Sequence, residues 1–291
     1  MLRWIDGGSF TMGSDRHYPE ERPARRVSVE GFWLDVSPVT NRAFSEFVEA
    51  TGHVTLAERT PDPSLYPHAL PQLLVAGSAV FSAPPGPVSL SDERAWWAYV
   101  PGASWRHPEG PASSLEGRLD HPVVHVAYED ALAFAEWAGK TLPTEAEWEY
   151  AACGGNDGAE FAWGDELAPG GRHRANTWQG PFPHHDTAED GYAGTSPVGA
   201  FPPNRHGLVD MIGNVWEWTA TEELPARRTP PCCAPAPAGS HGPRRVIKGG
   251  SYLCTPDYCA RYRPAARQLL EADSTTSHVG FRCASRAPAP D

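Results

Sequence analysis

The sequence predicts a compact domain of short helices and strands, joined by long irregular loops and held together by aromatic packing. Its 31 prolines and 28 glycines make up about 20% of the 291 residues, against about 12% in average proteins. Because both residues interrupt helices, a fold built of long helices is excluded. The 11 tryptophans, 10 phenylalanines and 9 tyrosines supply apolar surface for a core, so the composition is not that of a disordered chain.

Charge and hydropathy exclude several classes of function. Lys and Arg number 24 against 36 Asp and Glu, a net charge of −12, which disfavours binding to duplex nucleic acid or an anionic membrane and favours bound cations. No run of about 18 apolar residues predicts a membrane span. The start, MLRWIDGGSFTMG, shows no signal-peptide pattern, so we expect a cytoplasmic protein, in which stable disulfides are uncommon.

The N-terminal part of the chain alternates as strands do. Apolar residues recur at Phe10 and Met12 and at Val27 and Val29, and a further strand is expected over residues 32–34. The charged segment DRHYPEERP separates the first two strands and predicts a turn.

Three helices are predicted by helical spacing and capping signals. The first covers residues 40–52 and the second 130–139, each closed by a glycine. The third begins at Thr144, which has with Glu147 the spacing of a capping box, and ends at the glycine pair 154–155. The apolar residues that mark the buried faces are Phe44, Phe47 and Val48, then Ala131, Phe134, Ala135 and Ala138, then Trp148 and Ala151.

The rest of the chain shows little periodicity. We expect residues 53–120 to form loops on the surface of the core, with aromatic residues at Trp96, Trp97, Tyr99 and Trp105. Residues 156–291 alternate turns with short apolar runs, among which 245–248 predicts a strand. The Pro/Ala-rich segment 221–243 is either a linker or a surface loop, and without an internal repeat we expect a single domain over residues 1–291.

His121 and His125 have the H-x3-H spacing of helical metal sites. However, the segment HPVVHV contains Pro122 and β-branched residues, and predicts a strand. In a strand the two rings would stand roughly 13 Å apart, too far to share a metal. We therefore expect no metal site here.

Cys254 and Cys259 are the most suggestive pair among the six cysteines. Zinc normally takes four N or S ligands, and no second pair or histidine tail follows at a suitable spacing. Two thiolates without a nearby histidine favour a soft ion of low coordination number, and Cu(I) is the natural choice. A short-loop disulfide and two unrelated buried thiols are the alternatives.

The other four cysteines carry less information. Cys232 and Cys233 are adjacent in the proline-rich loop, where exposed thiols, weak metal capture and a link elsewhere all stay open. Cys153 and Cys283 could pair with each other or stay reduced, and their spacing does not decide between the two.

Acidic and amide residues gather in glycine- and proline-rich loops between residues 176 and 217. Ca²⁺ takes carboxylate, amide and backbone carbonyl oxygens in such loops, although the EF-hand pattern is absent here. A solvated acidic surface is the alternative. The residues are Asn176, Asp186, Glu189, Asp190, Asn204, Asp210, Asn214 and Glu217.

Gly249 and Gly250 follow the strand expected at 245–248 and predict a bulge or a close backbone approach. Ser251 comes next, but a serine nucleophile would need a base that the sequence does not identify. No nucleophile elbow, phosphate-binding loop or dinucleotide fingerprint is present.

Long ordered segments of the chain resemble the formylglycine-generating enzymes, the sulfatase-modifying-factor family. They extend nearly from end to end: GGSFTMGS, SPVTNRAFSEFVEATGHVT, WWAYVPGASWRHPEGP, HPVVHVAYEDALAFAEWAGKTLPTEAEWEYAA, FAWGDE, ANTWQGPFP, EDGYAGTSPVGAFPPNRHGLVDMIGNVWEWT, RVIKGGSYLCTPDYCARYRPAARQ and HVGFRCA. The resemblance implies an irregular α+β fold related to C-type lectins and low in regular secondary structure.

The oxidases of this family carry GGS-x2-C-x4-C, which Ser251, Cys254 and Cys259 match. The resemblance implies that the two cysteines hold Cu(I). It further implies that the cysteine of a C-x-P-x-R segment, in an unfolded or nascent sulfatase, adds as third ligand. O2 is then activated at copper, the substrate Cβ–H is cleaved, and a thioaldehyde is hydrolysed to Cα-formylglycine. Ser251 and Tyr258 would line the pocket for the substrate cysteine and oxygen, with Trp216 as an aromatic wall.

The resemblance also implies two structural calcium sites. The first set is the side chains of Asn176 and Asp190 with the carbonyls of Thr177 and Tyr192, and the second is the side chains of Asp210 and Glu217 with the carbonyls of Gly213 and Val215. This favours bound calcium over a merely solvated acidic surface.

The chain departs from the family at three places. Cys153 is offset by one position from a family cysteine that, with the equivalent of Cys283, forms a disulfide, and Pro264 replaces a further structural cysteine. Segment 221–243 is not the family's usual sequence, so a thiol substrate other than a sulfatase stays open.

Two other functions are found on the same fold. An iron-dependent thiol sulfoxide synthase needs a separate His-rich helical domain, for which 291 residues leave no room. A non-catalytic lectin-like binding member does not need the cysteine pair. The pair at 254 and 259 therefore favours the oxidase, which we expect to be a monomer.

Overall fold

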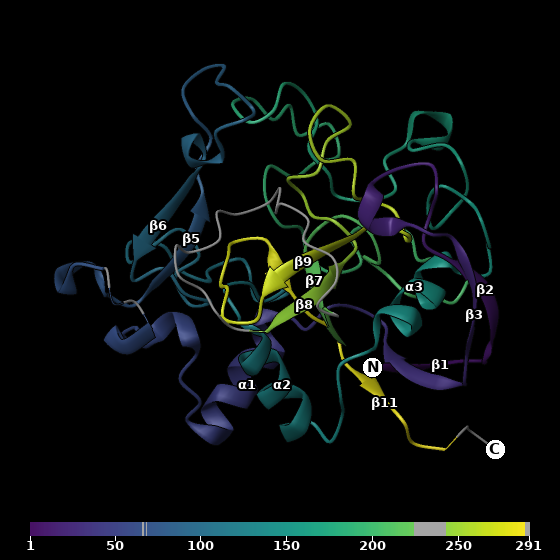
Figure 1. Cartoon of the computed structure of the whole chain (residues 1–291), viewed down its shortest axis with the longest axis horizontal. Helices are drawn as coiled ribbons and strands as arrows, with labels where there is room; N and C mark the ends of the chain where they lie inside the picture. Colours follow the sequence, from purple (N-terminus) through teal and green to yellow (C-terminus); the bar gives the residue numbers. More distant parts are fainter. Residues whose placement is uncertain (66, 68, 224–242, 289–291) are drawn as a thin grey trace.

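The computed structural model describes residues 1–65, 67, 69–223 and 243–288, and in this part of the chain three α-helices accompany four small sheets (Figure 1). The α-helices are α1 (Asn41–Thr51), α2 (Tyr128–Trp137) and α3 (Glu145–Cys153). The strands are β1 (Leu2–Ile5), β2 (Gly8–Met12), β3 (Arg25–Val29), β4 (Phe32–Asp35), β5 (Gly77–Phe81), β6 (Trp97–Pro101), β7 (Trp216–Glu222), β8 (Arg244–Lys248), β9 (Arg267–Glu271), β10 (Val279–Gly280) and β11 (Ala284–Ser285). Short 3-10 helices cover Pro19–Glu21, Leu56–Glu58, Pro63–Leu65, Pro71–Leu73, Glu93–Ala95 and Pro169–Gly171.

A sheet of order β10-β7-β8-β9 lies near the centre of the view in Figure 1. Strands β7 and β9 pair antiparallel with β8, and β10 pairs parallel with β7. The other sheets are β1-β4-β11 and the antiparallel pairs β2-β3 and β5-β6. The predicted α+β fold, with little regular secondary structure and long loops, is confirmed.

The helices form where local signals place them. Helix α1 is capped by Thr40 and ends at Gly52, whose φ of 69° lies in the left-handed region that glycine tolerates. Helix α3 begins after Thr144 with the predicted capping box. Helix α2 begins two residues earlier than predicted, because the Asp130 carboxylate accepts the Ala127 N–H at 2.9 Å and so closes the first turn.

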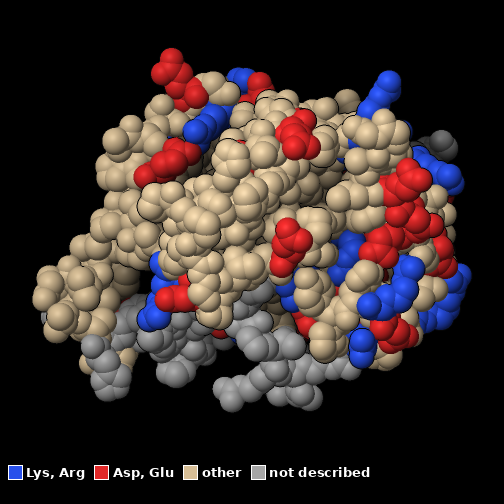
Figure 2. All heavy atoms as spheres, turned by 90° about the horizontal axis from the view of Figure 1, so that it is seen from above, with Lys and Arg blue, Asp and Glu red and all other residues tan. Residues whose placement is uncertain are grey.

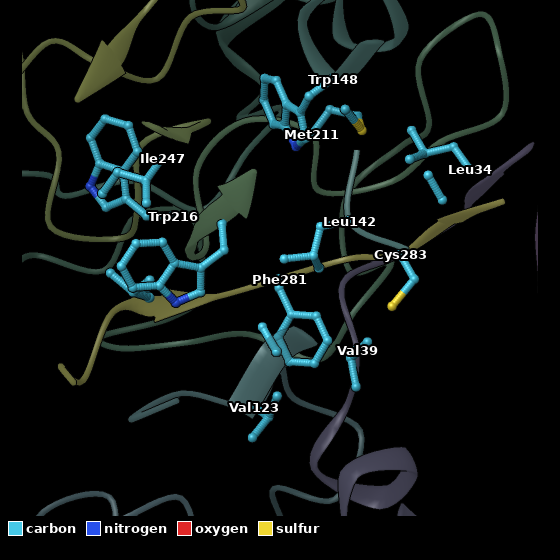
Figure 3. Packing of buried hydrophobic residues seen from close by; sticks show 14 of the residues in the cluster. Leu34, Val39, Val123, Leu142, Trp148, Met211, Trp216, Ile247, Phe281 and Cys283 are labelled. Carbon is cyan, nitrogen blue, oxygen red and sulfur yellow. The ribbon is translucent and has the colours of Figure 1, made fainter. Parts of the chain in front are cut away.

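The core is built from aromatic residues of distant segments. Figure 3 shows Trp148 of α3, Trp216 of β7, Ile247 of β8 and Phe281 in one cluster, and all four are buried. Burying an aromatic or aliphatic side chain of this size contributes roughly 1.5–3 kcal/mol. The aromatic residues therefore form the core, as the composition predicted.

The prediction of surface loops over 53–120 is wrong for part of the segment. Strands β5 and β6 pair within it, and Ala79 of β5 forms a bridge with Thr276. Trp96, Trp97 and Trp105 are buried. The periodicity was too weak to predict these strands, because their partners are supplied by tertiary packing.

The strand predicted over HPVVHV is also wrong. Pro122 forms a single bridge to Thr40, and His125 has a left-handed φ of 61° that no regular strand contains. The two imidazoles have different partners: His121 Nδ1 lies 2.9 Å from Thr195 Oγ1, and His125 Nδ1 lies 2.7 Å from Ser78 Oγ. Each ring therefore has a partner of its own within the protein.

Two surface properties complete the description. Among the described helices, none combines the length and apolar character that crossing a bilayer requires. On the face shown in Figure 2, Lys and Arg side chains are interspersed with Asp and Glu rather than gathered into one basic area.

Candidate active site

The loop that follows β8 carries the predicted cysteine pair. Gly249 and Gly250 have φ of 99° and 72°, and a Cβ on Gly250 would lie 2.8 Å from the carbonyl oxygen of Arg261. The close backbone approach predicted for these glycines is confirmed. It folds the loop back so that Ser251, Cys254 and Cys259 come together.

Cys254 and Cys259 face each other at the centre of this loop. Their Sγ atoms lie 3.5 Å apart, far beyond the about 2.05 Å of an S–S bond, so the short-loop disulfide is not formed. The two residues are 1% and 2% exposed. The Ser251 N–H donates to Cys254 Sγ at 3.4 Å, and Arg261 Nη1 donates to Cys259 Sγ at 3.7 Å. Each sulfur thus accepts from one N–H group of the surrounding loop.

The two sulfurs fit a Cu(I) ion. Soft thiolate ligands select Cu(I), which accepts a low coordination number. Among the described residues, no three His, Cys, Asp or Glu side chains converge on one point. The donor set here is therefore Cys254 and Cys259 alone, too few for a closed zinc site.

A narrow pocket reaches the two sulfurs. Its volume is about 10 Å³, room for about one water-sized group beside the cysteines. The residues that line it are Trp96, Trp97, Phe182, Ser251, Leu253, Cys254, Tyr258, Cys259 and His278. The structure thus brings together Ser251, Tyr258 and both cysteines.

Tyr258 is held between two aromatic rings. Its ring stacks on Phe182 with centroids 4.9 Å apart and planes 10° apart, and Trp96 contacts it edge-on at 5.6 Å. These contacts fix the orientation of the phenol at the pocket.

Trp216, expected as an aromatic wall, lies in the same buried cluster as the two cysteines but does not line the pocket. Its Nε1 is buried and has no hydrogen-bond partner in the described part of the chain.

His278 is a titratable pocket residue that the sequence did not predict. Burial lowers its pKa to about 3, so the ring is neutral at pH 7. Trp96, Trp97, Phe182 and Leu253 also line the pocket without having been predicted as site residues. Only the composition signal, an excess of aromatic residues in irregular chain, could have pointed to them.

The remaining cysteines lie elsewhere. Cys153 and Cys283 are free, buried and in different core clusters. Burial raises the pKa of Cys153 to about 12 and raises that of Cys283 further still, so both stay protonated thiols. Cys232 and Cys233 lie outside the described residues.

Hydrogen bonds through Gln179 link two members of the first predicted calcium set, Thr177 and Asp190. Thr177 O and Asp190 Oδ2 both accept from Gln179 Nε2, the second at 2.9 Å. Asn176 Oδ1 is buried without a hydrogen-bond partner among the described residues, and Tyr192 N–H donates to Asp190 Oδ1 at 3.0 Å. A buried amide oxygen without a donor is a candidate ligand for a hard cation, although both Asp190 oxygens already accept hydrogen bonds from protein donors.

The second predicted set is differently balanced. Both oxygens of Glu217 accept from Arg282, at 2.7 and 2.8 Å, and Trp148 Nε1 donates to Oε2 at 2.7 Å. Asp210 accepts from Gly199 N–H at 2.7 Å, and burial raises its pKa to about 6. Because Arg282 already compensates the Glu217 charge, the side chains of this set fit a cation less well than those of the first set. The carbonyls of Gly213 and Val215 are the other predicted ligands of this second set.

Three of the other members of the acidic cluster have structural partners, whereas Glu189 is exposed. Asn204 Nδ2 donates to the carbonyl of Ala151 at 2.8 Å, and Asn214 Oδ1 accepts the N–H of Ser196 at 3.0 Å. Asp186 accepts the N–H of Ala188 at 3.0 Å. The cluster is therefore not simply a solvated acidic surface.

The chain thus has an irregular α+β fold with a buried cysteine pair beside an aromatic pocket. A family model described as the sulfatase-modifying factor enzyme 1-like domain matches residues 2–287. The chain belongs to this family.

Several relatives are similar over nearly the whole chain. A formylglycine-generating enzyme of Mycobacterium tuberculosis is 55% identical over 96% of this chain and 95% of its own. That of Thermomonospora curvata is 49% identical over 97% and 92%. An "inactive C-alpha-formylglycine-generating enzyme 2" of Mus musculus is also similar, 41% identical over 98% and 86%.

Solved structures support the fold. PvdO of Pseudomonas aeruginosa has a TM-score of 0.60 at 25% identity, covering 97% of this chain and 93% of its own. A variable protein of Treponema denticola has a TM-score of 0.57 at 19% identity, covering 98% and 94%.

Proposed function

We propose that the chain is a formylglycine-generating enzyme, an oxidase that converts a specific cysteine of a sulfatase to Cα-formylglycine. The carrying observation is the pair of buried sulfurs 3.5 Å apart at the pocket, in a chain 55% identical to a formylglycine-generating enzyme. We further propose that the substrate cysteine lies in a C-x-P-x-R segment of an unfolded or nascent sulfatase, that Cu(I) is the cofactor and that O2 is the oxidant.

Cys254 and Cys259 would hold the Cu(I). Bound there, the ion would supply the redox chemistry by which O2 oxidises a thiol. The N–H of Ser251 and the guanidinium of Arg261 donate to the two sulfurs and would compensate part of the charge of the thiolate form, which is the form that binds metal.

The pocket residues would receive the substrate cysteine. Because the pocket has room for about one water-sized group, an incoming thiol must displace water from beside the two sulfurs. Trp96, Phe182 and Tyr258 form walls that exclude solvent and orient the substrate.

Calcium is proposed as a structural ion at the first set, Asn176, Thr177, Asp190 and Tyr192, on the strength of the orphaned Asn176 oxygen. The second set remains a prediction. A cytoplasmic location remains a prediction. The monomeric state also remains a prediction.

The test is direct. The purified protein is loaded with Cu(I), incubated in air with a reductant and a peptide containing C-x-P-x-R, and the peptide is examined by mass spectrometry for an aldehyde trapped with a hydrazine. We expect aldehyde from the wild type, and neither aldehyde nor bound copper from Cys254→Ser or Cys259→Ser. Cys153→Ser, the same change away from the pocket, is the matched control and should retain both.

The alternative is a non-catalytic binding member of the family, favoured by the similarity to a relative named inactive. It predicts that the wild type binds no stoichiometric copper and leaves the peptide unmodified. Copper binding without conversion of this peptide, but with conversion of another thiol, would instead indicate a different substrate.

A further inference from the structure

His278 stands directly before β10, and its imidazole lines the same pocket as the two cysteines. The residue is 1% exposed. Its ring packs on Trp97 with centroids 4.8 Å apart and planes 38° apart. The ring is therefore held in one place, with no freedom to turn toward solvent.

The two ring nitrogens differ in their partners. Nδ1 lies 3.1 Å from the hydroxyl of Thr276, whereas Nε2 is buried and has no hydrogen-bond partner within residues 1–65, 67, 69–223 and 243–288. A buried polar atom without a partner is unfavourable, and one at the edge of a pocket can be satisfied by whatever enters the pocket.

The Thr276 hydroxyl decides which nitrogen carries the proton. Thr276 is 2% exposed, and His278 Nδ1 is the acceptor within reach of its hydroxyl. A buried hydroxyl that keeps its proton unshared is costly, so Thr276 donates to Nδ1. In a neutral ring this leaves the hydrogen on Nε2, which becomes a donor for the pocket.

His125 shows what a purely structural histidine looks like in the same fold. It is fully buried, yet its Nδ1 lies 2.7 Å from Ser78 Oγ and its Nε2 lies 2.9 Å from the carbonyl of Pro108. Both of its nitrogens are satisfied by the protein. At His278 one nitrogen is satisfied and the other is left for whatever occupies the pocket.

We propose that His278 contacts the substrate, its Nε2–H donating a hydrogen bond to the sulfur of the substrate cysteine as that residue lies against Cys254 and Cys259. This rests on the proposed function. Because the pocket holds about one water-sized group and is lined by both cysteines and the imidazole, a sulfur that enters it lies beside the ring that carries the unpartnered nitrogen. The hydrogen bond would stabilise the thiolate over the thiol.

The experiment measures peptide binding to the metal-free protein under reducing conditions. Two labelled peptides are compared by fluorescence anisotropy, one with C-x-P-x-R and one with alanine at the cysteine. His278→Leu removes the donor, and His278→Gln, of similar volume, retains an amide N–H. We expect His278→Leu to weaken binding of the cysteine peptide about ten-fold and to leave the alanine peptide unchanged. His278→Gln should retain most of the affinity.

Two results would overturn the inference: unchanged affinity of His278→Leu for the cysteine peptide, or an equal loss for both peptides, which a merely structural role predicts. If His278→Leu does not fold, Thr276→Val replaces it. This variant keeps the ring but releases the proton from Nε2, so it should lower affinity for the cysteine peptide alone; equal affinities for wild type and variant would overturn the inference.

The inference and the proposed function fail separately. A wild type that makes no aldehyde from any cysteine peptide contradicts the proposed function. A wild type that makes aldehyde, together with a His278→Leu variant that binds and turns over the cysteine peptide as well as wild type, contradicts the role of His278 alone.

Discussion

The carboxylate of Glu217 and the guanidinium of Arg282 form a two-pronged ion pair, at 2.7 and 2.8 Å, with both side chains fully buried. Arg282 also donates to the carbonyls of Asp35, Val36, Val209 and Asp210. One side chain near the C-terminal end thus ties β4, β7 and the loop before β7 together. Removing either partner would leave a buried charge uncompensated.

Arg282→Met is expected to destabilise the protein by about 3–5 kcal/mol, because it leaves the Glu217 carboxylate buried without its cation. Urea denaturation measures the change. The double variant Glu217→Gln with Arg282→Met removes the charge as well, so it should be more stable than the single variant. A loss below about 1 kcal/mol in the single variant would contradict this account.

Phe182→Leu should lower kcat/KM for a cysteine peptide several-fold while changing stability little. The substitution removes the ring that stacks on Tyr258, an interaction worth about 0.5–1.5 kcal/mol, and so releases the phenol at the pocket. Phe10→Leu is the matched control, because Phe10 contacts Tyr150 in another core cluster and neither residue lines the pocket. Equal kinetic losses in the two variants would argue against a positioning role for the stack.

Removing calcium with a chelator should lower the melting temperature, and adding it back should restore it, because a ligand that binds only the folded state stabilises it by mass action. Asp190→Asn should largely abolish this calcium-dependent shift. Asp186→Asn, in the same loop but outside the proposed set, should retain it. A wild-type melting temperature that does not respond to calcium would refute the site.

The buried His125 should make stability depend on pH. Burial lowers its pKa to about 4 from the ordinary 6.5, so between these values the unfolded chain binds a proton that the folded chain does not. The contribution of neutral His125 to the free energy of unfolding is therefore fully present above pH 6.5 and is lost as the pH falls toward 4.

His125→Asn, an exchange that tolerates the left-handed φ of 61°, should remove this dependence. Between about pH 7.5 and about pH 5, the wild type should lose about 2 kcal/mol more than the variant in urea denaturation. Parallel pH profiles for the two proteins would show that another group is responsible.

The sequence alone determined the local features of the molecule. The caps at Thr40 and Thr144, the close approach at Gly250 and the spacing of Cys254 and Cys259 were all readable, because each depends on residues a few positions apart. Hydrophobic spacing and capping are properties of short segments, so they can be predicted without the fold. The ordered motifs along the chain also indicated the family.

Only the tertiary structure decided what surrounds the two sulfurs. Trp96, Phe182 and His278 are far apart along the chain, and the irregular segments between them show no periodicity. They meet at one pocket because buried aromatic rings and backbone pairings such as Ala79 with Thr276 bring them together. The unshared Nε2 of His278 likewise exists only in the folded state, since whether a polar atom has a partner depends on neighbours that folding supplies.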